Sequence, residues 1–246
     1  MKTILALSFV LISTFSGMAQ TADEIITSSI KATGGNAWDQ VNGIKMSSVI
    51  DQGGMKMPLE IVILRDGRTY TKINVQGMDI YQNVYDGTNL WSTNFLTMEP
   101  EKSDAEAVEN FKQSMLDFPS PFFTYKKHGY AVERLADETI DGVNCYKIKM
   151  TMKPERINGV EVPNVEFHFI DKDSHALIMT ESEITEGEMA GKISQVKFSD
   201  YQEIQGVFMA YSMDQGVKDL GSQIIAFSSI EVNPTVDTSV FTYAGK

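Results

Sequence analysis

The chain has 246 residues, of which 42% are apolar and 22% charged, with 21 Lys and Arg against 33 Asp and Glu. This composition is that of a globular protein and excludes disordered and collagen-like chains. The net charge of −12 argues against an extended phosphate-binding surface, so nucleic acid is not an expected partner. Cys145 is the single cysteine of the sequence, which excludes an internal disulfide. No cysteine follows the expected signal peptide at 1–19, so a lipid anchor is not expected.

The first 19 residues have the pattern of a secretory signal peptide. A positive start at Met1-Lys2-Thr3 precedes an uncharged, mostly apolar run at 4–15, and Gly17-Met18-Ala19 supplies the small residues of a cleavage site. We therefore expect a signal peptide at 1–19 and a single domain at 20–246, in which the loss of Lys2 moves the net charge from −12 to −13. No later run approaches the ~20 apolar residues of a transmembrane helix. The expected location is the periplasm, as a soluble protein without a lipid anchor.

Two segments have the start signals and apolar spacing of helices. Thr21 and Glu24 have capping-box spacing ahead of an apolar run that ends at Gly34-Gly35, and a short turn is expected at 37–41. The same spacing recurs at Ser103 and Glu106, and Pro119 with Pro121 is expected to end that helix near 118. In the polar turn that follows at 126–129, His128 is expected to be solvated.

Most of the remaining sequence alternates apolar and polar residues with period two, the pattern of half-buried strands. Such segments lie at 44–50, 57–64, 68–75, 78–85, 89–94, 131–138, 146–152, 165–169, 176–184, 190–200, 207–213 and 222–231. Hairpin-type breakers such as Asp66-Gly67, Asp86-Gly87 and Asp141-Gly142 separate many of them. We predict a mainly β fold: an unclosed, strongly curved antiparallel barrel of about 11–12 strands, with a lid made by the N-terminal helix and the helix near 103–118.

No catalytic motif is present, and an enzyme is not expected. His168, His175 and Glu166 are candidate metal ligands across a hairpin, but two imidazoles without a clear further ligand are weak evidence, so neither metal nor cofactor is predicted. Cys145 has no convincing histidine partner in the sequence and is interpreted as an inert small residue.

Rows of methionine and aromatic residues indicate an apolar cavity. Methionine is flexible and polarisable, which suits surfaces that adapt to variable apolar shapes, and the mature chain keeps twelve of the fourteen methionines. The expected cavity residues are Trp91, Ile148, Met150, Phe167, Phe169, Met179, Met209, Tyr211 and Met213. The expected lid residues are Ile26, Ile30, Val108, Phe111, Met115 and Leu116.

The segment Asn83-Val84-Tyr85-Asp86-Gly87-Thr88-Asn89-Leu90-Trp91 resembles the D-G-x-x-L-W hairpin of the LolA/LolB-like lipoprotein carriers. Segments 31–38, 141–148, 201–207 and 230–234 are similar to longer, Bacteroidetes-type members, in the same order along 21–242. The resemblance implies a monomeric carrier of lipidated proteins or lipids, working between an inner-membrane exporter and an outer-membrane acceptor. In such carriers an arginine on an early strand bonds the lid backbone. Arg65 is the nearest match, and Arg68 is the other candidate.

Two other functions are compatible with the sequence. The same fold serves envelope-stress regulatory modules that bind a protein partner, in which the apolar face senses stray lipoprotein. The other hypothesis is a hydrolase that uses His168, His175 and Glu166, and it predicts a bound metal.

Overall fold

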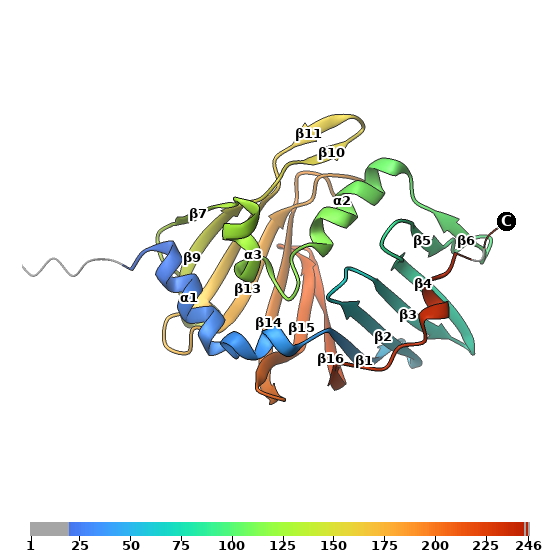
Figure 1. Ribbon diagram of the computed structural model, residues 1–246, viewed down its shortest axis with the longest axis horizontal. Coiled ribbons are helices and arrows are strands. Elements are labelled where there is room, and N and C mark those ends of the chain that lie inside the picture. The colour runs from blue at the N-terminus through green and yellow to red at the C-terminus, as the bar shows by residue number, and fades with distance from the viewer. Residues whose placement is uncertain (1–19, 244, 246) are drawn as a thin grey trace, which may run out of the picture.

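The computed structural model describes residues 20–243 and 245 (Figure 1). The expected signal peptide at 1–19 lies outside these residues. Within the described part of the chain, no helix is long and apolar enough to cross a membrane.

One antiparallel sheet forms most of the molecule. Among the described residues it has fourteen strands, in the order β6-β5-β4-β3-β2-β1-β16-β15-β14-β13-β12-β9-β7, with β8 also pairing with β9. The strands are β1 (Gly43–Gln52), β2 (Met55–Leu64), β3 (Thr69–Val75), β4 (Met78–Tyr85), β5 (Leu90–Thr93), β6 (Pro100–Lys102), β7 (Ala131–Arg134), β8 (Glu138–Ile140), β9 (Val143–Thr151), β12 (Val165–Asp171), β13 (Leu177–Glu183), β14 (Ile193–Ile204), β15 (Val207–Val217) and β16 (Gly221–Val232). A separate hairpin pairs β10 (Glu155–Ile157) with β11 (Val160–Val162).

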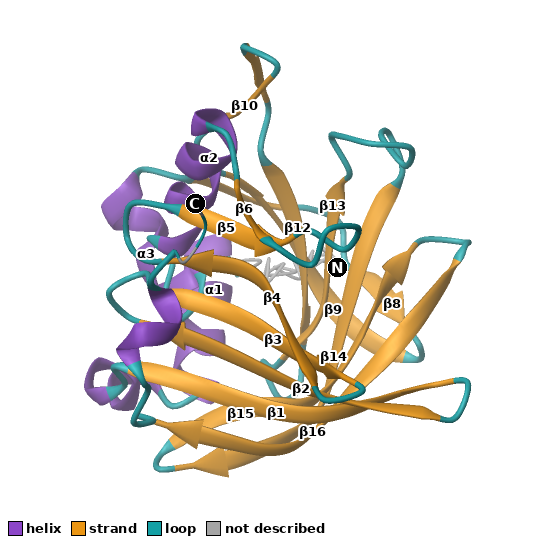
Figure 2. Ribbon diagram, turned by 90° about the vertical axis from the view of Figure 1, so that its right-hand side faces the viewer, coloured by secondary structure: helices purple, strands orange, loops and turns teal. Residues whose placement is uncertain are grey.

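The sheet is strongly curved and unclosed, since β6 and β7 lie at its two edges and do not pair with each other. Figure 2 shows the curved sheet, with the helices gathered along one side of it. This confirms the predicted class, a mainly β unclosed barrel with a helical lid, although the main sheet has fourteen strands where 11–12 were expected. The added strands are short ones, and β6 is an example.

The helices are α1 (Ala22–Ala32), the 3₁₀ helix η1 (Gly35–Gln40), α2 (Ala105–Met115), α3 (Pro121–His128) and the 3₁₀ helix η2 (Thr238–Phe241). The predicted capping box of α1 is present: the Thr21 hydroxyl accepts from the Glu24 amide at 3.3 Å, and the Glu24 carboxylate accepts from the Thr21 amide at 2.8 Å. Helix α2 begins one residue later than expected, because Asp104 caps it by accepting from the Ala107 amide at 2.8 Å.

Helix α3 was not predicted, and Pro121 begins a helix where the sequence pattern indicated only an end. Proline lacks the amide hydrogen that a first-turn residue does not need, and its fixed φ suits the first helical position. In α3 it occupies that first turn after Ser120. The Pro-Ser-Pro stretch at 119–121 therefore separates two helices of the lid.

The inner face of the sheet, defined as the face beneath α1 and α3, holds two apolar clusters. Ile25 and Ile26 of α1 are fully buried and pack with Phe122 of α3 over Ile148 and Met150. The second cluster centres on η1 and the strands at the middle of the sheet; it contains Trp38, Val41, Ile44, Met46, Leu59, Val207, Ile225, Phe227, Ile230 and Val232.

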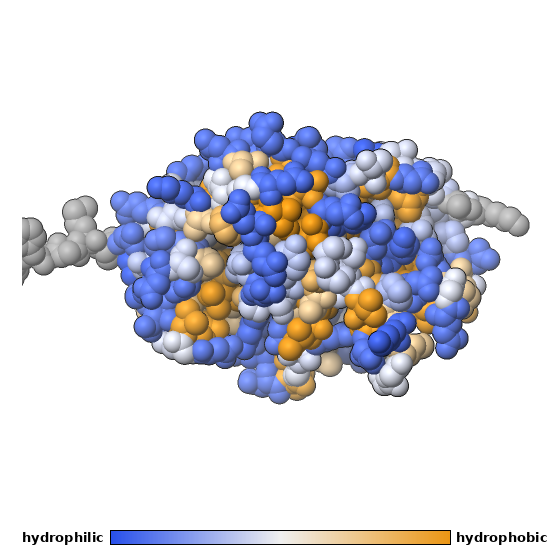
Figure 3. Space-filling model, turned by 90° about the horizontal axis from the view of Figure 1, so that it is seen from below, coloured by the Kyte–Doolittle hydropathy of each residue, from blue (hydrophilic) through white to orange (hydrophobic). Residues whose placement is uncertain are grey.

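The outer face has apolar clusters of its own. Cys145, Phe169 and Met179 are buried together near the end of the sheet where β8 pairs with β9. At the other end, Phe241 of η2 packs with Trp91 in a cluster that also contains Val62, Tyr70 and Val84. The molecule seen from below is a mixture of apolar patches set among polar residues (Figure 3).

The corner between α1 and η1 depends on Gly34. Its φ of +115° lies in the left-handed region, and a Cβ there would stand 2.6 Å from the Gly206 carbonyl oxygen and 2.9 Å from Val207 Cα. We predict that Gly34→Ala lowers the free energy of unfolding by about 2 kcal/mol or more, since both the backbone conformation and the contact are strained. Urea denaturation measures the loss.

Gly35→Ala is the matched control for that substitution. Gly35 has φ of +55°, and nothing lies within 4 Å of an added Cβ, so its loss is expected to stay near ~1 kcal/mol. If the free energy of unfolding falls equally in the two variants, the close approach of Gly34 to the β14–β15 turn does not contribute to stability.

Candidate ligand cavity

A cavity of about 400 Å³ lies between the lid and the inner face of the sheet. Its wall comes from α1, η1, the end of α2, the segment 117–123, and strands β1 and β12–β15. The apolar part of the wall consists of Ile30, Trp38, Met46, Pro119, Pro121, Phe122, Phe123, Leu177, Phe198, Phe208, Met209, Ala210 and Met213. This volume is within the range of small-molecule and cofactor pockets.

Part of the predicted set lines this cavity. Met209 and Met213 contribute from β15, and Ile30 contributes from α1. Tyr211 packs against the cluster around Trp38. Ile148 and Met150 lie on the inner face as well, where Ile26 of α1 and residues of α3 cover them, and none of the three lines the cavity.

Phe167, Phe169 and Met179 lie on the outer face, away from this cavity. The register pairs His168 with Ile148 on β9, so the inner row of β12 is Glu166, His168 and Ile170, and the two phenylalanines alternate to the other side. Both rows of β12 contain apolar or aromatic residues, which is why the sequence pattern did not identify the inner one.

Trp91 also lies outside the cavity. It is buried against η2, with its ring nitrogen 3.4 Å from the Phe241 carbonyl oxygen. The neighbouring pair Tyr85 and Leu90 alternates to the other face, where the Tyr85 ring meets Phe111 of α2 at 5.5 Å between centroids. The D-G-x-x-L-W hairpin therefore has its tryptophan in the outer core.

The apolar stripe of α2 packs loosely. Phe111 contacts Tyr85, a Cβ on Gly67 would lie 3.6 Å from Met115, Leu116 is 48% exposed, and Val108 is half-buried. None of these four residues lines the cavity; Ser114 at the end of α2, together with the segment that follows, does so.

Arg65 connects the sheet to the lid. Its Nε donates to the Val41 carbonyl at 2.6 Å, a second guanidinium nitrogen donates to the Trp38 carbonyl, and the guanidinium lies 5.1 Å from the Phe118 ring centroid. Arg68 instead forms an ion pair with Asp66 at 2.8 Å. Of the two candidates, Arg65 is therefore the one that contacts η1.

Trp38 joins the parts of the lid around Arg65. Its ring nitrogen donates to the Thr33 carbonyl at 2.8 Å, and its ring meets Phe118 and Phe123 edge-on at 6.5 and 6.1 Å between centroids. Trp38 of η1 thus contacts both the end of α1 and the aromatic residues around the α2–α3 connection, at the cavity wall. The sequence signals for this part of the site were Trp38 beside the double glycine and the aromatic pair after Pro121.

Glu166 and His168 are the titratable groups that β12 places at the cavity. Burial raises the pKa of Glu166 to about 7, a hydrogen bond to Thr180 partly opposes this, and the charge of Asp117 adds to it. Burial lowers the pKa of His168 to about 3, so its ring is neutral. His168 Nε2 lies 3.3 Å from Glu166 Oε2, and among the described residues neither ring nitrogen has a well-aligned hydrogen-bond partner. Phe122 covers the His168 ring at 4.6 Å.

Asp117 holds the α2–α3 segment in place. Its carboxylate accepts from the Tyr130 hydroxyl at 2.9 Å and from the Thr124 hydroxyl, and it lies 3.0 Å from His128 Nδ1. The expectation of a solvated His128 was wrong: its side chain is 11% exposed, because the residue belongs to the last turn of α3 and faces this carboxylate.

Within the described residues, no three His, Cys, Asp or Glu side chains are grouped so that they could hold a metal. His175 stacks on Tyr146 with 13° between the ring planes. Burial raises the pKa of the Cys145 thiol to about 11, so the reactive thiolate is disfavoured.

Solved structures share this fold. A DUF1329-family protein from Desulfovibrio piger is 14% identical, with a TM-score of 0.55, over 92% of this chain and 99% of that chain. A domain named for outer-membrane lipoprotein sorting, from Vibrio parahaemolyticus, is 12% identical, with a TM-score of 0.52, over 89% and 95%. A LolA-superfamily protein from Nitrosomonas europaea is 13% identical, with a TM-score of 0.51, over 91% and 98%. No family model and no curated protein matches the sequence. These likenesses confirm the expected LolA-like fold.

The raised pKa of Glu166 predicts a pH-dependent stability. Between pH 4.5 and about 7, Glu166 is ionised in the unfolded chain but still protonated in the folded protein. Its contribution to the free energy of unfolding therefore falls as pH rises through this interval. Glu166→Gln removes this dependence. The free energy of unfolding of the variant, relative to that of the unmodified protein, should therefore rise by up to ~3 kcal/mol across that interval. Urea denaturation at several pH values measures the difference.

Glu203→Gln, which changes an exposed carboxyl on β14, is the control for the loss of one charge. A stability difference between Glu166→Gln and the unmodified protein that stays constant with pH would contradict the raised pKa.

Proposed function

We propose that this chain, which has the fold of the LolA-like proteins, is a periplasmic, non-enzymatic carrier that shields the acyl chains of lipoproteins, or a free lipid, during transfer toward the outer membrane. The observation that carries this proposal is the apolar cavity of about 400 Å³ between the lid and the sheet. The expected signal peptide at 1–19 supports the location. An inner-membrane exporter and an outer-membrane acceptor are the partners that such a route requires.

The physical need for a carrier follows from the cost of exposing an acyl chain to water. At ~0.8 kcal/mol per buried methylene, a single long chain costs more than ~10 kcal/mol in water. A cavity wall of methionine and aromatic side chains replaces that water with apolar contact, and methionines such as Met209 and Met213 adapt to chains of different shape.

Release requires that the lid opens at little cost. In addition to its apolar contacts, the closed lid is tied to the sheet by two hydrogen bonds that Arg65 donates, to the backbone carbonyls of Trp38 in η1 and of Val41 just after it. A ligand that enters beneath the lid competes with this closed state, so the apparent affinity depends on how stable the closed state is. Arg65 therefore acts, in this proposal, as the contact that favours emptying.

Filling the cavity tests the proposal directly. Residues 20–246 should bind a fluorescent fatty-acyl probe saturably, and Met209→Trp combined with Met213→Trp should weaken binding at least about tenfold, because the added rings occupy the cavity. Displacement titration measures both affinities.

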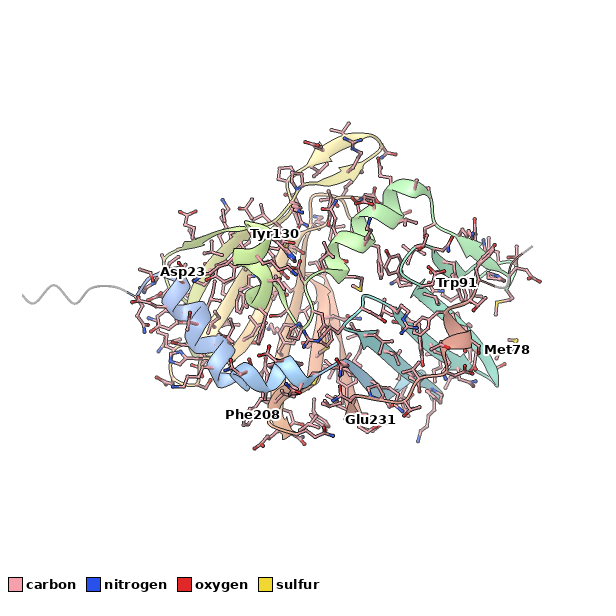
Figure 4. All side chains as sticks on the ribbon, in the orientation of Figure 1. Asp23, Met78, Trp91, Tyr130, Phe208 and Glu231 are labelled. Atoms are coloured by element: carbon pink, nitrogen blue, oxygen red, sulfur yellow. The ribbon has the colours of Figure 1, made fainter. Side chains whose placement is uncertain are left out.

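Met78→Trp is the matched control. Met78 is 54% exposed and lies at the far end of the molecule from Tyr130 (Figure 4), so the same substitution there should leave binding unchanged. No saturable binding by the unmodified protein, or equal binding by the cavity variant and the control, would reject the carrier function.

Removing the Arg65 contact tests the role of the lid. Arg65→Leu destabilises the closed, empty state, so we expect a roughly tenfold tighter apparent affinity and slower release of the probe. Stopped-flow displacement gives the release rate, and circular dichroism checks that the variant is folded. Arg68→Leu removes a charge from the same hairpin but no contact to η1, and should change neither quantity. Weaker or unchanged binding by folded Arg65→Leu would contradict the proposed role.

A further inference from the structure

A second hollow adjoins the cavity and differs from it in chemistry. It has a volume of about 250 Å³ and shares four wall residues with the cavity: Ser114, Asp117, Pro121 and Glu166. Polar side chains line much of the rest, among them Gln113 of α2 and Ser182 of β13. An apolar space thus continues into a polar one, and a ligand with an apolar chain and a polar end fits across the border.

Glu166 lies at that border. Its side chain is 24% exposed, and it is part of the wall of both hollows. Asp117 is the second carboxylate that both hollows share. Glu166 therefore presents hydrogen-bond acceptor atoms where the polar end of a bound chain arrives.

The charges around the two hollows are mainly negative. No Lys or Arg is among the described residues that line the apolar cavity. The second hollow has Glu155 on its wall and Lys153 as the cation among its described lining residues, and Lys153 is solvent-exposed. A ligand that ends in a carboxylate would place its charge beside Glu166 and Asp117, without a buried cation to balance it.

Building on the proposed carrier function, we propose that the paired hollows select acyl ligands whose polar end is an uncharged amide, as in an N-acylated peptide, over those that end in a carboxylate. The amide N–H donates to the Glu166 carboxylate, and such charge-assisted hydrogen bonds are the stronger ones. The polar wall that includes Gln113 and Ser182 then accommodates the peptide groups that follow. A head group without an N–H donor loses the first of these contacts, and an anionic head group meets repulsion as well.

Three competitors with the same acyl chain separate these contributions: oleoylglycinamide, methyl oleate and oleate. Each displaces a fluorescent fatty-acyl probe from residues 20–246 at about pH 8, above the pKa of about 7 of Glu166. We expect oleoylglycinamide to bind about tenfold or more tightly than oleate, with methyl oleate between them. Oleate that binds as tightly as oleoylglycinamide would overturn the inference.

Glu166→Gln tests whether this carboxyl sets the preference. The substitution keeps the shape and removes the charge, so oleate should bind more tightly, oleoylglycinamide less tightly, and the ratio should fall to about threefold or less. Glu181→Gln is the matched control, because Glu181 pairs with Phe167 on the outer face and lines neither hollow. An unchanged ratio in folded Glu166→Gln would overturn the inference.

The outcomes distinguish this inference from the function on which it rests. Saturable binding of all three competitors with equal affinity leaves the carrier function in place and removes the amide preference. Absence of saturable binding by every competitor removes both.

Discussion

An unclosed sheet leaves apolar side chains that nothing in the sheet itself can cover, and this constraint shapes the rest of the molecule. In a closed narrow barrel the inner side chains meet one another across the axis. Here the edge strands β6 and β7 do not pair with each other, so the inner face needs helices to remove it from water. Ile25 and Ile26 of α1 and Phe122 of α3 cover Ile148 and Met150 completely. Over β14 and β15 the cover is incomplete, and the cavity is what remains between the two surfaces.

Helices α1 and α3 are held on the sheet by buried apolar side chains, and directional polar contacts add to this at the two sides of the cavity. Arg65 bonds the η1 backbone, and Asp117 gathers Tyr130, Thr124 and His128 at the other side of the cavity. The apolar stripe of α2 contributes little burial, since none of its residues is fully covered. Directional contacts of this kind break at definite points, so a lid built on them has closed and open positions instead of a gradual loosening.

Much of the fold was predictable from the sequence because strand alternation and turn chemistry are local. Strand β4 at 78–85 was expected with its observed bounds, and the Asp-Gly turns separate the strands as predicted. The faces of β12 were not predictable, because Phe167 and Phe169 alternate with Glu166 and His168 and only the pairing of His168 with Ile148 shows which row faces the lid. Helix α3 was missed because Pro121 both ends and begins helices, and the environment of His128 depends on Asp117, eleven residues away. Cavity residues thus depend on cross-strand register, which is a non-local property.

The placement of the two tryptophans makes intrinsic fluorescence a measure of whether the cavity is occupied. Trp38 stands at the cavity wall against Phe118 and Phe123, whereas Trp91 is enclosed in the outer core beside Phe241. An occupant of the cavity alters the surroundings of one indole and leaves the other as an internal reference. Emission from the unlabelled protein therefore separates into an occupancy signal and a constant background, and Trp91→Phe isolates the former without touching the cavity wall.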